Sequence, residues 1–133
     1  APETGLSADT AALLAAGLGG GVSRLREVCG AVSGAAVVLG MLHGSVNPLD
    51  QEAKTALYAE VQELAVEFER RNGSYICRDL LGLPPGRDDP APSARTPQYY
   101  QKRRCGELIA SMASLLEKHL AEEKNPASPE ENG

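Results

Sequence analysis

Apolar residues recur three and four positions apart in every apolar segment of this 133-residue chain, and this spacing constrains the fold more than any other feature. Such spacing places side chains on one face of an α-helix, whereas a half-buried strand needs alternation over several residues. No stretch alternates for long enough to predict a strand. The length suits one core rather than two. We therefore expect an all-α, single-domain helical bundle of about four to five helices over residues 1–123.

Two helices are expected in the first third of the chain. The first begins after Ser7, whose hydroxyl can cap an N-terminus, and ends at Gly17. The second spans residues 23–43 and follows a glycine turn at residues 19–21. The predicted core positions are Ala11, Leu14 and Leu18 in the first segment and Leu25, Cys29, Val32, Ala36 and Leu39 in the second. The thiol of Cys29 is therefore expected near the start of this helix, facing the core.

The third helix is expected from Asn47-Pro48 to about Arg71, because Asn caps helices well and Pro is tolerated at the first helical position. Gly73 ends it, and a short helix then starts near Cys77 and ends at Gly82. The predicted buried face of the third helix is Ala53, Leu57, Val61, Leu64 and Phe68, and its charged residues, among them Glu60, Glu63 and Glu67, are expected to face water.

A proline-rich connection is predicted over residues 83–97, followed by a last helix over about residues 98–122 and a disordered tail over residues 124–133. The inward stripe of the last helix is Cys105, Leu108, Met112, Leu115 and His119. We expect His119 to contact the carbonyl groups at the helix end. His43 lies roughly 21 Å beyond Cys29 along a helix axis, so these two residues are not expected to share a ligand site.

Charge and hydropathy exclude two classes of partner. The formal net charge is -5 and the basic residues are interspersed with acidic ones, which argues against nucleic-acid binding because phosphate contacts need a basic face. The longest mostly apolar stretch, residues 28–42, is too short for a membrane span. No transmembrane segment and no secretory signal is recognised, so a cytoplasmic location is expected.

The three cysteines, Cys29, Cys77 and Cys105, are isolated in sequence, so the thioredoxin-type CxxC, zinc-knuckle and covalent-haem CxxCH patterns are all absent. Each cysteine has basic neighbours, such as Arg26 before the first and Arg78 after the second. Positive charge and helix N-termini stabilise a thiolate, which is the reactive and metal-binding form. These three cysteines are the candidate catalytic residues and metal ligands. Burial as three small hydrophobic side chains is the alternative.

Glycines are unusually dense around Cys29. Such density costs helix stability and indicates that backbone or another thiol comes close. A tight turn between helices explains residues 19–21 better than a phosphate loop does, because neither the GK[ST] ending nor the GxGxxG fingerprint is present. An anion held by this turn remains an alternative. The candidate cofactor-binding residues are Gly20, Gly21, Gly30 and Gly34.

Several segments together resemble a known family. They are the glycines at residues 19–21, the CGAVSG segment at residues 29–34, the GSYICRDLLG segment at residues 73–82, and Cys105. In this order they resemble the bacterial and archaeal C_GCAxxG_C_C family of redox-active proteins, which carries a CGAxxG motif. The resemblance implies redox activity or metal–thiolate binding by Cys29, Cys77 and Cys105 acting together. The first of the four family cysteines has no counterpart here, which counts against a complete four-thiolate centre.

The predicted function is that of a redox-active protein with clustered cysteines and an unidentified redox partner. Its chemistry is thiol–disulfide exchange, electron transfer, or the binding of an iron–sulfur cluster or a thiolate-bound metal ion. Cys29 is the predicted attacking or ligating thiolate. Two other classes stay open: a small-ligand or anion-binding helical module that uses the turn at residues 19–21, and a structural subunit that forms a homodimer through faces of small residues.

Overall fold

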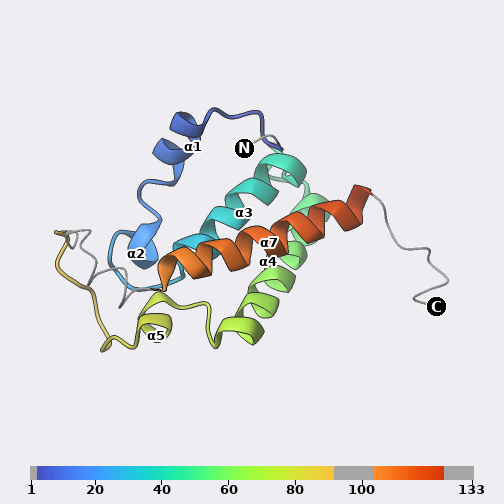
Figure 1. The fold of residues 1–133 in the computed structure, drawn as a ribbon. Helices are drawn as coiled ribbons and strands as arrows, with labels where there is room; N and C mark the ends of the chain where they lie inside the picture. Colours follow the sequence, from blue (N-terminus) through green and yellow to red (C-terminus); the bar gives the residue numbers. More distant parts are fainter. Residues whose placement is uncertain (1–2, 92–103, 125–133) are drawn as a thin grey trace.

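The structure, a computed structural model, describes residues 3–91 and 104–124. Over these ranges the regular elements are helices: α1 (Ala8–Ala15), α2 (Gly19–Val22), α3 (Gly30–His43), α4 (Gln51–Asn72), α5 (Cys77–Leu81) and α7 (Cys105–Lys124) (Figure 1). The described ranges hold no strand, and Val28 and Ile76 form an isolated antiparallel bridge. The all-α prediction is confirmed.

The core lies where α3, α4 and α7 pack against one another. Figure 1 shows α3 and α7 starting near α5 and running toward the same end of the molecule. The buried residues of this core are Val32, Ala35 and Leu39 of α3, Leu64 and Phe68 of α4, Leu80 of α5, and Leu108, Met112, Leu115 and Leu120 of α7. The predicted stripes on the third and last helices therefore do supply core residues.

Several predicted helix ends are found where the capping residues lie. The Ser7 hydroxyl accepts a hydrogen bond from the Thr10 amide at 3.1 Å and caps α1. Gly73 ends α4 with a φ of 98°, a conformation that favours glycine. The start of α4 was predicted too early, because Asp50 and not Asn47 accepts the capping hydrogen bond, from the Ala53 amide.

The predicted helix over residues 23–43 is wrong in its first third. Ser23, Arg24 and Arg26 have positive φ angles, which no right-handed helix contains. The chain turns back on itself here, and the Glu27 amide donates to the Gly21 carbonyl at 2.9 Å. Helix α3 consequently starts at Gly30, with Cys29 as its N-cap rather than a residue inside the helix. Leu25 is exposed, and Ala35 is buried in place of Ala36.

Helix α1 does not join the core as predicted. It contains no buried residue, and Leu13 and Leu14 are 77% and 60% exposed. In Figure 1 this helix, in dark blue, stands apart from α3 and α7. Ala11, Leu14 and Leu18 instead line a cavity between these elements. Helical spacing indicates which face of α1 is apolar, but not what covers that face.

Part of the predicted organisation falls beyond what the structure describes. Residues 83–91 form no helix, in agreement with the predicted connection. The rest of that connection, the predicted helix start over residues 98–103, and residues 125–133 of the predicted tail lie outside the described residues. Lys124 belongs to α7 and not to the tail.

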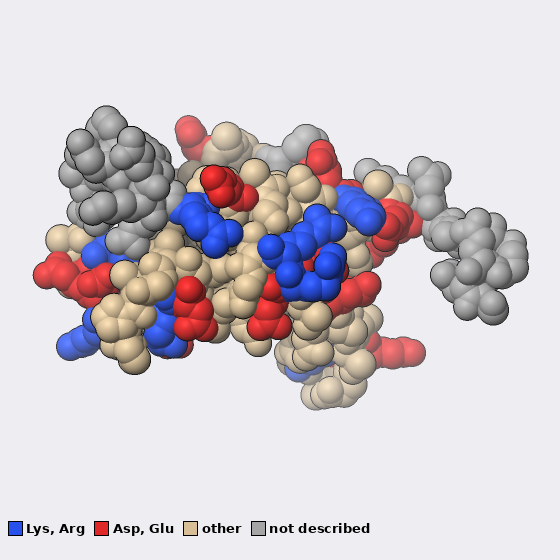
Figure 2. All heavy atoms as spheres, turned by 60° about the horizontal axis from the view of Figure 1, so that its bottom comes forward, with Lys and Arg blue, Asp and Glu red and all other residues tan. Residues whose placement is uncertain are grey.

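The described part of the chain contains no helix with both the length and the apolar character needed to cross a bilayer. Figure 2 shows basic and acidic side chains interspersed on one face of the molecule. Glu67 pairs with Arg70 and Arg71, and Glu27 pairs with Arg78. Positive charge on the described surface is therefore partly neutralised by adjacent carboxylates.

Candidate functional site

Each cysteine lies where a helix begins. Cys29 is the N-cap of α3, Cys77 is the first residue of α5, and Cys105 is the first residue of α7. All three line one cavity of about 810 Å³ and all are free thiols. Cys77 is 7% exposed, and the other two are partly buried. The structure thus brings three segments that are distant in sequence to one cavity.

Backbone pairing holds Cys29 beside Cys77. The Cys29 amide donates to the Tyr75 carbonyl at 2.9 Å, and the Cys77 amide donates to the Glu27 carbonyl at 2.6 Å. These bonds lie on either side of the isolated bridge between Val28 and Ile76. The segment before α3 and the segment before α5 are therefore fixed side by side.

Two glycines next to the cysteines allow other parts of the chain to approach their backbone closely. A Cβ atom on Gly21 would lie 2.6 Å from the Cys77 Cβ and 2.6 Å from the Glu27 amide nitrogen, and the φ of Gly21 is +65°. A Cβ atom on Gly30 would lie 2.8 Å from the Leu18 carbonyl oxygen. Gly20 and Gly34 also line the cavity, and Gly34 has open space around it. The expectation that backbone approaches closely here holds for Gly21 and Gly30.

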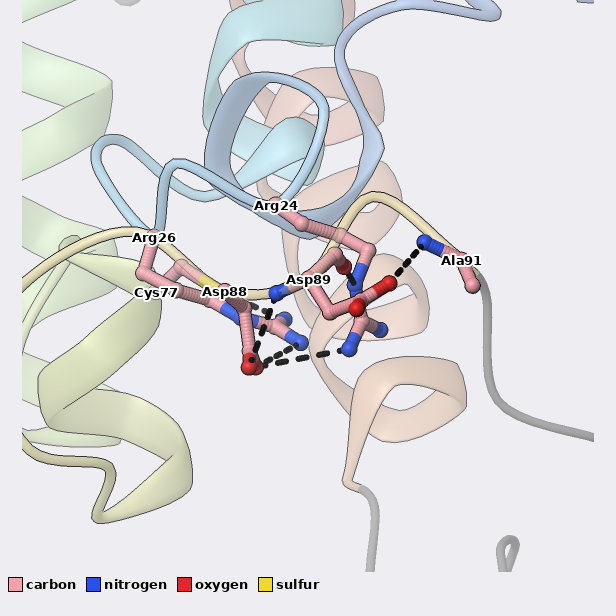
Figure 3. Close-up of polar contacts among 6 residues, drawn as sticks. All are labelled: Arg24, Arg26, Cys77, Asp88, Asp89 and Ala91. Carbon is pink, nitrogen blue, oxygen red and sulfur yellow. Dashed lines mark hydrogen bonds and ion pairs between the residues drawn. The ribbon is translucent and has the colours of Figure 1, made fainter.

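Arg26 is a buried cation that contacts the cysteine site. Arg26 is only 4% exposed. Its Nη1 atom lies 3.6 Å from the Sγ atom of Cys77. The Nε and Nη2 atoms donate to one oxygen of Asp88 at 3.2 and 3.0 Å (Figure 3). One guanidinium therefore joins a carboxylate to a sulfur. Sequence proximity associated Arg26 with Cys29, and that association is wrong because the guanidinium of Arg26 contacts Cys77 and Asp88 instead.

The segment after α5 folds back over this arginine. The Asp88 amide donates to the Arg24 carbonyl at 2.9 Å, and the Arg24 side chain contacts Asp88 at 3.4 Å and the Asp89 carbonyl (Figure 3). The hydrogen bond from Arg26 holds the pKa of Asp88 below its usual range. Arg78, associated by sequence with Cys77, pairs instead with Glu27 at 2.8 Å. The arginine in contact with the Cys77 sulfur is therefore Arg26, which proximity in the sequence did not indicate.

The surroundings of Cys29 disfavour the thiolate form of its side chain. Burial raises its pKa above the ordinary value, and the neighbouring Cys77 and Cys105 raise it further. The backbone amides of Ala31 and Val32 act in the opposite direction but do not outweigh burial. In the absence of a metal, Cys29 is therefore a protonated thiol at neutral pH.

The two histidines lie away from the thiols, at the far ends of α3 and α7. The prediction that His43 and Cys29 do not share a site agrees with their positions at the two ends of α3. The predicted role of His119 is wrong, because its Nε2 atom contacts Glu60 Oε2 at 2.8 Å. Glu60, predicted to face water, has a side chain only 18% exposed. Spacing within one helix cannot reveal such contacts, because they depend on how three helices pack.

The fold and the cavity define a small all-α protein with a three-thiol site. Residues 1–119 match the model of the family described as "Putative redox-active protein (C_GCAxxG_C_C)". The chain belongs to this family, because the match covers most of its length. No curated protein and no solved structure matches the chain. The family membership confirms the resemblance found in the sequence and supports a redox role in general terms.

Proposed function

We propose that Cys29, Cys77 and Cys105 act as one redox site and that its reaction is thiol–disulfide exchange with a partner. The observation that carries the proposal is the convergence of the three thiols on one cavity, with Arg26 against one of them. Membership of a redox family supports the same chemistry. The positive charge of Arg26 lies where the negative charge of a Cys77 thiolate would form.

In this reaction the Cys77 thiolate attacks a partner disulfide, and one partner sulfur leaves as a thiolate. The Cys29 thiol then attacks Cys77 in the mixed disulfide, which releases the second partner sulfur. The protein gains an intramolecular disulfide and gives two electrons to the partner, which becomes a dithiol by taking one proton from the Cys29 thiol and one from water. Cys29 was the attacking or ligating thiol predicted from sequence, but burial raises its pKa, and the guanidinium of Arg26 lies against the sulfur of Cys77 instead.

Geometry at the bridge is compatible with this pair. Cys29 and Cys77 each follow one member of the bridged pair Val28 and Ile76, so they are diagonal neighbours. Diagonal neighbours in such pairing are about 7–8 Å apart. A disulfide needs the two Cα atoms within about 7 Å, so a small backbone movement closes it.

Mild oxidation of the folded protein tests the proposal. We expect exposure to diamide to remove two thiols and to give a Cys29–Cys77 linkage in peptide mass mapping. The C29S and C77S variants should each fail to form this linkage, whereas C105S should retain it. Three unmodified thiols in the oxidant-treated folded protein would contradict disulfide exchange.

A second function is favoured by the number of sulfur donors, which is one more than a disulfide uses. Three thiolates can hold a metal ion or an iron–sulfur cluster if an outside group supplies a further ligand. Anaerobic purification followed by metal analysis and visible absorption tests this function. We expect a chromophore that each single Cys→Ser change weakens, and a colourless, metal-free preparation would contradict metal binding.

The cavity itself favours a third function, small-ligand binding. Its volume falls within the range of about 300–1,000 Å³ that is typical of ligand pockets. A compound that raises the Tm of the wild type and of a triple Cys→Ser variant equally would establish binding apart from the thiols.

The exposed Val37, Met41 and Ile109 are compatible with the predicted homodimer, for which sedimentation is the test.

A further inference from the structure

Four titratable side chains meet at the end of the helix bundle that lies opposite the thiols. His43 is the last residue of α3, Glu60 lies within α4, and His119 and Glu123 lie one turn apart near the end of α7. We call these residues the His–Glu cluster. Figure 1 shows the ends of α3 and α7 coming together beside α4. Three helices thus contribute to one group of imidazole and carboxylate side chains.

The contacts within the His–Glu cluster are short and mutual. Glu60 contacts His43 Nδ1 at 2.9 Å and His119 Nε2 at 2.8 Å. Glu123 contacts His43 Nε2 at 3.1 Å and His119 Nε2 at 3.4 Å. Each carboxylate therefore contacts both imidazole rings. The side chains are 16% to 38% exposed, so a water-sized ligand can reach the cluster.

We propose that the His–Glu cluster binds one divalent transition-metal ion, with Zn²⁺ the best suited. His43, Glu60 and Glu123 offer one imidazole nitrogen and two carboxylate oxygens, a set of three protein ligands that leaves the fourth tetrahedral position of Zn²⁺ open, and His119 contacts both carboxylates as an outer partner. With bonds of about 2.0–2.1 Å, tetrahedral ligand atoms lie roughly 3.3 Å apart. His43 contacts Glu60 through Nδ1 at 2.9 Å and Glu123 through Nε2 at 3.1 Å, so one of its two ring nitrogens would turn toward the ion.

The ligand atoms of His43, Glu60 and Glu123 all lie within 4.8 Å of one another. Small rotations of these side chains suffice to turn the donor atoms from one another toward a shared ion. The donor set also disfavours Mg²⁺ and Ca²⁺, which prefer an all-oxygen shell.

The residues of the His–Glu cluster come from the three helices that form the core. His43 is the last residue of α3, Glu123 lies in the last turn of α7, and Glu60 of α4 contacts both His43 and His119. A bound ion would therefore cross-link all three core helices at the end that lacks the thiol site. The inference does not depend on the proposed thiol chemistry, because the two sites share no residue.

Titration of the reduced, metal-free, full-length protein with Co²⁺ separates the two sites. Thiolate ligation gives strong near-ultraviolet charge-transfer bands, whereas an imidazole and carboxylate site gives visible bands without them. We expect part of the bound Co²⁺ to give visible bands without the near-ultraviolet charge-transfer bands of thiolate ligation. One equivalent of Zn²⁺ should displace this Co²⁺. Absence of Co²⁺ with these properties would overturn the proposal.

Isosteric variants assign the site. E60Q and E123Q each remove a carboxylate ligand, and we expect each to weaken Zn²⁺ binding at least tenfold. E63Q and E122Q are matched controls on the same helix turns, where the exposed side chains are not part of the cluster. Zn²⁺ affinities of E60Q and E123Q equal to those of the controls would overturn the proposal. Circular dichroism checks folding, and E123Q keeps the test decisive if E60Q does not fold.

Discussion

The Nη1 atom of Arg26 lies 3.6 Å from the Sγ atom of Cys77, although 51 residues separate them in the chain. The same guanidinium binds Asp88, so the segment after α5 holds the arginine against the sulfur. A hydrogen bond to a charged acceptor is stronger than one to a neutral acceptor. The arrangement therefore places a positively charged hydrogen-bond donor where the negative charge of a Cys77 thiolate would form.

Replacing Arg26 should slow the chemistry of Cys77. We expect R26Q to reduce the iodoacetamide alkylation rate of Cys77 roughly tenfold at neutral pH, because a hydrogen bond to a charged group is worth about 1.5–3 kcal/mol. Mass spectrometry of peptides that contain Cys77 measures this rate. R24Q is the matched control, since Arg24 also pairs with Asp88 but is not within hydrogen-bond distance of Cys77. Equal alkylation rates in the two variants would refute the role of Arg26.

A methyl group at Gly21 should disturb the pairing of Cys77 with the turn. We expect G21A to lower the free energy of unfolding by about 2–4 kcal/mol, because an L-residue is strained at this φ and its Cβ would overlap Cys77. G34A is the matched control. Its Cβ meets no atom within 4 Å and lies in α3, so we expect it to stabilise by about 0.5–1 kcal/mol. Urea unfolding measures both, and destabilisation of similar size in the two variants would contradict the packing argument.

Cys29 should react as a thiol with a raised pKa. Burial is the main cause, so the alkylation rate of Cys29 in the reduced, metal-free protein should reach half its maximum above about pH 9. Because the folded state holds this proton more tightly than the unfolded state, the contribution to stability is present below the unfolded pKa and is lost as pH rises. Alkylation in urea gives the unfolded reference. A folded-state midpoint at or below that reference would show the prediction to be wrong.

The His–Glu cluster should stabilise the metal-free protein in a limited pH window. Burial lowers the pKa of His119, but its hydrogen bond to Glu60 and the charge of Glu123 raise it overall. Burial raises the pKa of Glu60, but its hydrogen bond to His119, together with Glu123 and His43, lowers it overall. The His119 contribution is lost as pH rises through its raised pKa, and the Glu60 contribution is lost as pH falls through its lowered pKa.

Both contributions are therefore present between about pH 4.5 and pH 6.5. With EDTA present, we expect E60Q to cost about 1 kcal/mol of unfolding free energy near pH 5.5 and clearly less near pH 8.5. Urea unfolding of the wild type and E60Q at both pH values measures the difference. A cost that does not change between the two pH values would show that the pairing carries no charge.

Much of the fold could be predicted from local pattern. The apolar spacing of residues 108–115 and 64–68 identified buried faces that the structure confirms. The caps Ser7 and Gly73 marked helix ends because their backbone conformations are set by the nearest neighbours in the chain. The turn before α3 could not be predicted, because apolar spacing continues through it and Arg24 and Arg26 adopt positive φ angles that their residue types do not indicate.

For the candidate site, the residue types were visible in the sequence but their partners were not. Cys29, Cys77 and Cys105 stand out as the chain's three thiols, and the surrounding glycines indicated close backbone contact. Which arginine faces Cys77 depended on the reversal of the chain after Gly21. The grouping of His43, Glu60 and His119 depended on the packing of α3, α4 and α7.

The sequence by itself determined that this protein is helical, where most helices end, and which family it belongs to, because these follow from spacing, capping and motif order along the chain. Only the tertiary structure decided that α1 stands away from the core, that three helix starts surround one cavity, and that Arg26 serves Cys77. The physical reason is that these contacts join distant segments. Their energies depend on side-chain packing across helices, which spacing within a single segment does not encode.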